Sequence, residues 1–282
     1  MSPASIFDEA NILDDPDVEQ VLTRTSVSNG TVLARQGKKG NEMYIVTKGR
    51  FSVIDEKADN FVITMLGPGE IFGEMSFLAE SPRSATVVAT EDGEVLSLSR
   101  KALPGLLKKS PSKVAHLASG LCQLMAERLR EADDIQSLIL TDEELGVSDE
   151  IAALYGRHQS WKKAPIRLLD EPGILETCQA INTTAHQVLV EQWERSTDLF
   201  VVQSGKVNVT DDRSGGFLIT SFEPGEVFGE ISFIDGRPRS ATVSVAEPGE
   251  VLFLSRDAVT GLMDRDPALA ANLMIVIGQL LA

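Results

Sequence analysis

The chain carries the same 34-residue stretch twice, at a constant separation of 156 positions. Residues 67–100 (GPGEIFGEMSFLAESPRSATVVATEDGEVLSLSR) align without a gap on residues 223–256 (EPGEVFGEISFIDGRPRSATVSVAEPGEVLFLSR), and 22 of the 34 positions are identical. The same offset pairs Pro111 with Pro267 further along the chain. A duplication of this length predicts two units that share one fold, and it excludes folds in which the two halves of the chain differ in architecture.

The repeat divides the 282 residues into two domains and a linker. A chain of this length has room for two ordinary domains. We predict a first domain over 1–135, an acidic linker over 136–161 and a second domain over 162–282. A capping-box pattern, Thr141-x-x-Glu144, indicates that the linker is helical.

Each copy is a series of short apolar segments interrupted by Gly and Pro; in the first copy they are TVLARQ, EMYIVTKG, RFSVID, NFVITML, ATVVAT and EVLSLSR. Such segments at intervals of roughly 8 to 12 residues predict a compact antiparallel roll. After the last segment the apolar residues over 114–129 recur at steps of three and four, which is one face of a helix. We therefore predict a mainly β protein with helices: two tandem antiparallel, jelly-roll-like β-rolls, each with a short helix in the repeated stretch and a C-terminal helix.

The net charge of -16 comes from two segments of the chain. Residues 1–20 contain six acidic residues and residues 131–150 contain eight, neither segment contains a basic residue, and the rest of the chain has 28 acidic against 26 basic residues. These segments are either solvated faces and a linker or a docking surface for a basic partner. A chain this acidic repels a phosphate backbone, so we expect no nucleic-acid partner.

Other classes of protein are disfavoured by what the sequence lacks. It has no run of about 18 apolar residues that could span a bilayer, and its first 20 residues do not resemble a targeting sequence. We expect a cytoplasmic protein without membrane insertion. Cys122 and Cys178 are far apart and only three histidines accompany them, so we expect no metal site. No GxGxxG, GxxxxGK[ST] or GxSxG motif is present, so we expect that the chain is not an enzyme.

The repeated stretch contains a set of groups suited to a small anion. In both copies Phe-Gly-Glu is followed by an arginine nine residues after the glutamate: Glu74 with Arg83, and Glu230 with Arg239. Glycine lets the backbone approach a ligand closely, a helix that starts there offers free amide hydrogens to an anion, and arginine adds charge-assisted hydrogen bonds. A carboxylate beside an anion suits a hydroxyl donor. An anion next to a sugar hydroxyl describes a small nucleotide.

With these residues each copy resembles the cyclic nucleotide-binding domain family, found in the bacterial catabolite activator protein, the regulatory subunits of cyclic AMP-dependent protein kinase and cyclic nucleotide-gated channels. The resemblance is carried by the pattern F-G-E-x-[AS]-[LF]-x(4)-P-R-[AST]-A-T, which we call the phosphate cassette (72–86 and 228–242). It implies that Glu74 and Glu230 bind the ribose 2'-hydroxyl and that the arginines bind the cyclic phosphate. It also implies that the C-terminal helix closes over the base.

The resemblance implies one cyclic nucleotide per copy and no metal. The ligand-binding residues that it assigns are Phe72, Gly73, Glu74, Met75, Ser76, Pro82, Arg83, Ser84 and Ala85 in the first copy, and Phe228, Gly229, Glu230, Ile231, Ser232, Pro238, Arg239, Ser240 and Ala241 in the second. The serine after each arginine occurs in binders of cyclic AMP and of cyclic GMP alike. We favour cyclic AMP and keep cyclic GMP as the alternative.

The predicted function is a tandem cyclic-nucleotide receptor without an effector domain of its own, because the chain ends at Ala282, level with Ala126 in the first copy. Movement of the lid and linker would then act on an unidentified protein partner or on self-association. The apolar tail LMIVIGQLLA indicates burial in a homodimer or a sequence that stops short of its natural end. We expect the two sites to differ. The alternatives are a protein-interaction scaffold with degenerate, non-binding pockets and a sugar-phosphate binder or enzyme.

Overall fold

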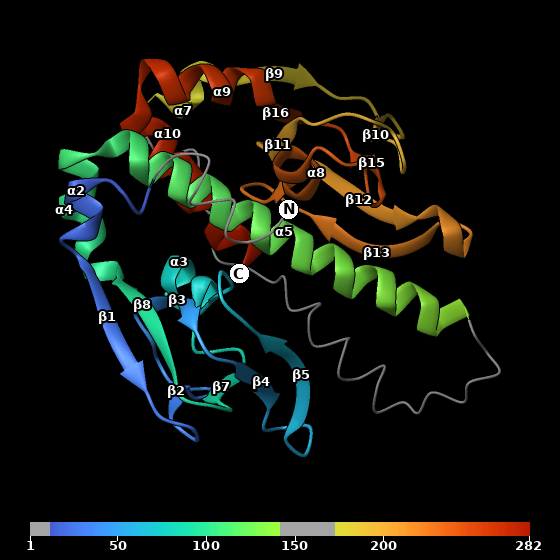
Figure 1. Ribbon diagram of the computed structural model, residues 1–282. Helices are drawn as coiled ribbons and strands as arrows, with labels where there is room; N and C mark the ends of the chain where they lie inside the picture. Colours follow the sequence, from blue (N-terminus) through green and yellow to red (C-terminus); the bar gives the residue numbers. More distant parts are fainter. Residues whose placement is uncertain (1–11, 142–172) are drawn as a thin grey trace. The chain divides into compact units, whose positions relative to one another are not determined.

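The computed structural model describes residues 12–141 and 173–282 (Figure 1). Two compact units are present, and we describe each by itself. The first runs up to Cys122 and also includes Leu262–Ala282, whereas the second is Gln123–Gly261. Each unit therefore consists of one roll and a helical segment that the sequence places in the other copy.

The first roll is an all-antiparallel structure of short strands. They are β1 (Leu22–Val27), β2 (Val32–Ala34), β3 (Glu42–Lys48), β4 (Phe51–Asp55), β5 (Phe61–Leu66), β6 (Ile71–Phe72), β7 (Thr86–Ala89) and β8 (Gly93–Ser99). They form two sheets, with strand orders β1-β8-β3-β6 and β2-β7-β4-β5.

The second roll repeats this topology strand for strand. Its strands are β9 (Gln179–Asn182), β10 (Val188–Val190), β11 (Leu199–Val202), β12 (Lys206–Asp211), β13 (Phe217–Phe222), β14 (Val227–Phe228), β15 (Thr242–Glu247) and β16 (Glu250–Leu254). The strand orders are β9-β16-β11-β14 and β10-β15-β12-β13. The prediction of two tandem antiparallel β-rolls is confirmed.

Apolar side chains from the two sheets fill the inside of each roll. The core of the first includes Phe51 and Phe72, and that of the second includes Val207 and Phe228 at the equivalent positions. Burying a phenylalanine contributes about 1.5–3 kcal/mol. The ring of Phe72 also stacks on that of Tyr44, with centroids 4.8 Å apart. The core therefore supports the strand ends from which the phosphate cassettes start.

Helices precede, interrupt and follow the strands. In the first copy they are α2 (Pro16–Glu19), α3 (Glu74–Ala79), the 3-10 turn η1 (Arg100–Ala102), α4 (Leu103–Lys109) and α5 (Pro111–Thr141). In the second they are α7 (Ile174–Thr177), the 3-10 turn η5 (Asp212–Ser214), α8 (Glu230–Asp235), α9 (Arg256–Arg265) and α10 (Pro267–Leu281). Both cassettes thus contain a six-residue helix, and both copies end in a long one, as predicted.

The C-terminal helix α10 packs within the first unit. It contacts α3, Gln279 donates a hydrogen bond to the carbonyl oxygen of Leu78 at 3.3 Å, and the Cys122 thiol donates to the carbonyl oxygen of Met274 at 3.2 Å. Leu273 and Ile277 are fully buried. The apolar tail, which the sequence assigned to a dimer or to a shortened chain, is therefore covered within the chain itself, because α3 offers it an apolar face.

Two sequence predictions fall wholly or partly outside the described residues. The predicted linker, 136–161, is described only up to Thr141, where α5 ends. The domain limits stay a prediction, since the boundary between the compact units falls inside α5 and inside α9. None of the helices described is long and apolar enough to cross a membrane.

Candidate functional site

The second residue of each phosphate cassette is a glycine whose position leaves no room for a side chain. Gly73 has φ +79° and precedes α3, and Gly229 has φ +81° and precedes α8. A Cβ atom on Gly73 would lie 2.2 Å from Nη1 of Arg83. Glycine therefore serves both the left-handed turn and the close approach of the arginine.

Arg83 is buried and ties its cassette to strand β3. The guanidinium donates to the carbonyl oxygen of Gly73 at 3.1 Å and to that of Glu42 at 2.7 Å. It also lies over the ring of Tyr44, 5.7 Å from the centroid. Only 7% of Arg83 is exposed, so the cassette folds around this side chain.

Arg239 has the equivalent contacts in the second copy. It donates to the carbonyl oxygens of Gly229 at 3.1 Å and Asp198 at 2.9 Å, and it lies 5.6 Å from the ring centroid of Phe200. Its Nε also donates to the hydroxyl of Ser196 at 2.8 Å. In the first copy Gly40 stands at the position of Ser196, so no side chain there can accept the equivalent hydrogen bond from Arg83.

The two cassettes bring a carboxylate and a guanidinium together. Burial lowers the pKa of Arg83, and the charges of Tyr44, Glu42 and Glu74 oppose that shift. Glu74 is itself buried, with 3% exposed. An arginine stays protonated at neutral pH despite such a shift, so a buried positive charge faces a buried carboxylate within the cassette.

The second cassette has the same electrostatic arrangement with one further cation. Burial lowers the pKa of Arg239, the charges of Asp198, Glu194 and Glu230 raise it, and Arg130 lowers it. Glu230 is partly buried. The carboxylates and arginines that the sequence paired are therefore close enough to interact in both copies.

The other predicted residues take several positions around these groups. The hydroxyl of Ser84 contacts the sulfur of Met75 at 3.9 Å. Ser232 donates to the carbonyl oxygen of Pro238 at 3.4 Å. The exposed serines are Ser84 and Ser240, and the buried ones are Ser76 and Ser232. The remaining cassette positions divide into the buried Phe72, Phe228 and Ile231, the partly buried Ala85, Pro238 and Ala241, and the exposed Pro82.

A glutamine that the sequence reasoning overlooked positions the residue after each arginine. Gln36 donates from its amide group to the carbonyl oxygen of Ser84 at 2.9 Å, and Gln192 donates to that of Ser240 at 2.7 Å. The two glutamines are 156 positions apart. Their identity across the repeat was the available signal, but they lie outside the contiguous repeated stretch.

A second arginine pair holds the C-terminal ends of the cassette helices. Arg100 donates to the carbonyl oxygens of Phe77 at 3.0 Å and Leu78 at 2.5 Å. Arg256, its counterpart in the repeat, donates to the carbonyl oxygen of Ile234 at 3.0 Å. A basic side chain at the last carbonyls of a helix is favourable. Both residues close the repeated 34-residue stretch, so the repeat itself contained this signal as well.

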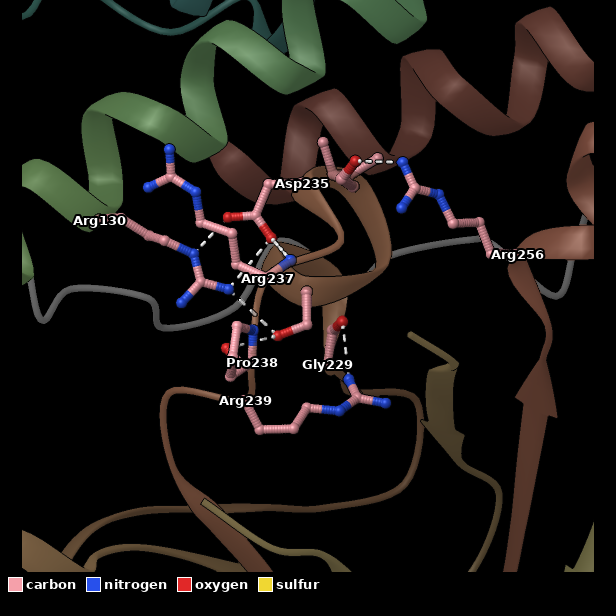
Figure 2. A network of polar contacts seen from close by, with 9 residues as sticks. Arg130, Gly229, Asp235, Arg237, Pro238, Arg239 and Arg256 are labelled. Atoms are coloured by element: carbon pink, nitrogen blue, oxygen red, sulfur yellow. Dashed lines mark hydrogen bonds and ion pairs between the residues drawn. The ribbon is translucent and has the colours of Figure 1, made fainter. Parts of the chain in front are cut away.

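Arg130, from α5, contacts the second cassette in a way that the repeat does not predict (Figure 2). Its Nη2 donates to a carboxylate oxygen of Asp235 at 3.1 Å and to the hydroxyl of Ser232 at 3.2 Å. Its Nε donates to the other carboxylate oxygen of Asp235. The offset of 156 has no partner for Arg130 within the sequence, which is why comparison of the copies could not find it.

The comparison with known proteins assigns the family. The sequence matches the family model for the cyclic nucleotide-binding domain twice, over residues 24–110 and 181–266. These two matches include both phosphate cassettes and cover more than half of the chain. The chain belongs to the cyclic nucleotide-binding domain family.

Curated relatives come from bacteria and eukaryotes. The chain is 42% identical over 106 residues to the cyclic AMP receptor protein of Thermus thermophilus, covering 37% of this chain and 47% of that protein. It is 26% identical over 246 residues to the cAMP-dependent protein kinase regulatory subunit of Yarrowia lipolytica, covering 87% and 55%. It is 26% identical over 258 residues to a cGMP-dependent protein kinase of Eimeria tenella, covering 90% and 21%. The chain thus spans about half the length, or less, of these relatives.

The family assignment agrees with the polar groups present. The cassettes offer arginine, carboxylate and hydroxyl groups, which suit a phosphate ester and a sugar. Among the residues of 12–141 and 173–282, no group of three histidine, cysteine or acidic side chains is arranged to hold a metal ion. A cyclic nucleotide is therefore the ligand class that the cassettes fit.

Proposed function

We propose that the chain is a receptor that binds one cyclic nucleotide at each phosphate cassette, with cyclic AMP preferred to cyclic GMP. Arg83 and Arg239 bind the cyclic phosphate, and Glu74 and Glu230 accept hydrogen bonds from the ribose. The observation that carries the proposal is the repeated convergence of a buried arginine and a glutamate on one glycine turn.

The arginines keep donors for a ligand. A guanidinium has five N–H donors, and the hydrogen bonds described use two of them in Arg83 and three in Arg239. A phosphodiester with its negative charge would meet a partly desolvated cation, whose charge-assisted hydrogen bonds are stronger than neutral ones. Of the three relatives described, two are named for cyclic AMP and one for cyclic GMP, and our preference for cyclic AMP follows the first two.

We further propose that occupancy acts through other proteins or through self-association of the chain, and not through catalysis. The matched regions are the family's binding domains, and the relatives include a kinase regulatory subunit. Nucleotide would favour one arrangement of the C-terminal helices, so that a binding surface changes when the ligand leaves. The partner and the cytoplasmic location stay predictions.

One observation favours a second candidate function. Both arginines already donate to backbone carbonyl oxygens, so they stabilise their cassettes without a ligand. A scaffold that binds a protein constitutively through two rolls would retain them for that reason alone.

Calorimetric titration with cyclic AMP and cyclic GMP separates the two. The receptor predicts micromolar or tighter binding with two sites, loss of one site in Arg83→Ala or Arg239→Ala, and loss of both in the double variant. Folded protein that binds neither nucleotide would refute the receptor and support the scaffold.

A further inference from the structure

The second cassette is held by a side chain that comes from the helix following the first roll. Arg130 lies on α5 within Gln123–Gly261, the same compact unit as α8. It meets both oxygens of the Asp235 carboxylate and the hydroxyl of Ser232. We propose that Arg130 is a positioning residue for nucleotide at the second cassette. Arg130 holds α8, and α8 in turn places the backbone and the Arg239 side chain that bind the phosphate. This inference rests on the proposed function.

The contact is of a kind that fixes geometry. The side chains of Arg130 and Asp235 are 13% and 5% exposed, and a bidentate arginine–carboxylate pair restrains both the direction and the distance of the contact. Removing one member of such a buried pair leaves the other charge without its partner, which is strongly destabilising. The position of α8 therefore depends on Arg130.

A six-residue helix needs such restraints. Helices this short are marginal by themselves, because few hydrogen bonds compensate the cost of nucleation. At its C-terminal end α8 is tied through the carbonyl oxygen of Ile234 to Arg256, and from the side it is tied to Arg130. Ser232 connects Arg130 to the residue before Arg239, since its hydroxyl donates to the carbonyl oxygen of Pro238 (Figure 2).

Arg130 is close enough to Arg239 that its charge opposes protonation of that arginine. The carboxylate of Asp235 compensates much of the Arg130 charge, so the role that we assign to Arg130 rests on its hydrogen bonds to α8.

The first cassette has no equivalent of this pair. Ala79 stands at the position of Asp235, and Ser81 at that of the exposed Arg237. The helix α3 is instead covered by α10, through Leu78. We therefore infer that binding at the second site depends on Arg130, whereas binding at the first site does not.

The test reads the second site alone, in full-length protein that carries Arg83→Ala. We expect Arg130→Met to weaken cyclic AMP binding at the second site about tenfold. This is the size of effect expected when a charged hydrogen bond that positions the binding residues is lost. The matched control is Arg237→Ser. It removes an exposed cation from the same cassette and installs the residue of the first copy, so we expect little change.

A double-mutant cycle distinguishes positioning from general destabilisation. Asp235→Ala installs the residue of the first copy, and we expect Arg130→Met to cause little further loss in that background, because the pair is already broken. In Arg239→Ala protein, which reports the first site, Arg130→Met should leave the affinity unchanged. Arg130→Lys, which keeps a cation beside Asp235, should recover part of the lost affinity and serves as the readout if Arg130→Met does not fold.

The outcomes are separable. If Arg83→Ala protein with native Arg130 binds neither nucleotide, the proposed function fails at the second site. If it binds and Arg130→Met binds equally well, or weakens both sites alike, the positioning role is overturned and the proposed function stands.

Discussion

Replacing Gly73 by alanine tests whether the cassette is built around its arginine. The added methyl group has two effects that the structure separates. The backbone would hold alanine at φ +79°, and its Cβ would lie 2.2 Å from Nη1 of Arg83 and 2.9 Å from the carbonyl oxygen of Glu42. Since Glu42 begins strand β3, Arg83 is the group that must move.

The expected cost follows from these two effects. A left-handed alanine costs about 1–2 kcal/mol, and the loss of a charged, buried hydrogen bond adds about 1.5–3 kcal/mol. We therefore expect Gly73→Ala to lower the free energy of unfolding by about 2.5–5 kcal/mol. The displaced arginine should also weaken nucleotide binding at the first site by tenfold or more, that is, by about 1.4 kcal/mol or more.

A matched control isolates the backbone effect. Gly30 has φ +82°, and no atom of the described residues lies within 4 Å of the position that a Cβ atom would take there. The second copy tolerates His186 at the same turn with φ 63°. Gly30→Ala should lose only about 1–2 kcal/mol and should bind nucleotide normally. Urea denaturation and calorimetric titration of both variants provide the comparison. Equal stability losses in the two variants, with normal binding in Gly73→Ala, would refute the steric argument.

Three further outcomes follow from individual side chains. Burial, then the hydrogen bond and charge of Glu42, raise the pKa of Tyr44 from 10.0 to about 12. The stabilisation that follows from this shift is present below pH 10 and is lost as the pH rises towards 12. Tyr44→Phe should therefore flatten the alkaline fall in melting temperature, and an unchanged fall would contradict this. Burial raises the pKa of the Cys122 thiol, so mass spectrometry should find Cys122 alkylated only on unfolding, whereas the half-buried Cys178 should react first. Equal alkylation rates of the two cysteines in the folded protein would contradict this. Leu121 is fully buried, so Leu121→Ala should lower the urea-measured free energy of unfolding by about 2–5 kcal/mol, and a loss under about 1 kcal/mol would show that the site collapses without a cavity.

The fold was predictable because its signals are local and present twice. Gly and Pro between short apolar segments indicated the strands, and the change of period after residue 110 indicated the terminal helix. The Phe-Gly-Glu and Arg pattern led to the cassettes, since both members of each pair lie within ten residues of one another. Duplication then separated retained chemistry from variable loops.

What the sequence could not predict depends on contacts between distant segments. Ser196 bonds to Arg239 across 43 positions, and Arg130 bonds to Asp235 across 105. Nothing near Arg130 distinguishes it from a solvated helix arginine. The same holds for the apolar tail: its composition requires burial, but only the folded chain identifies α3 as the surface that buries it.

The location of α10 has a consequence for how the protein is made. This helix is the last part of the 282-residue sequence, and Gln279 bonds to Leu78, 201 positions earlier. Loop closure over such a distance carries an entropic cost and slows folding. When the ribosome has produced the first roll, the cover of its cassette helix has therefore not yet been made, and that apolar surface stays open until α10 has been translated.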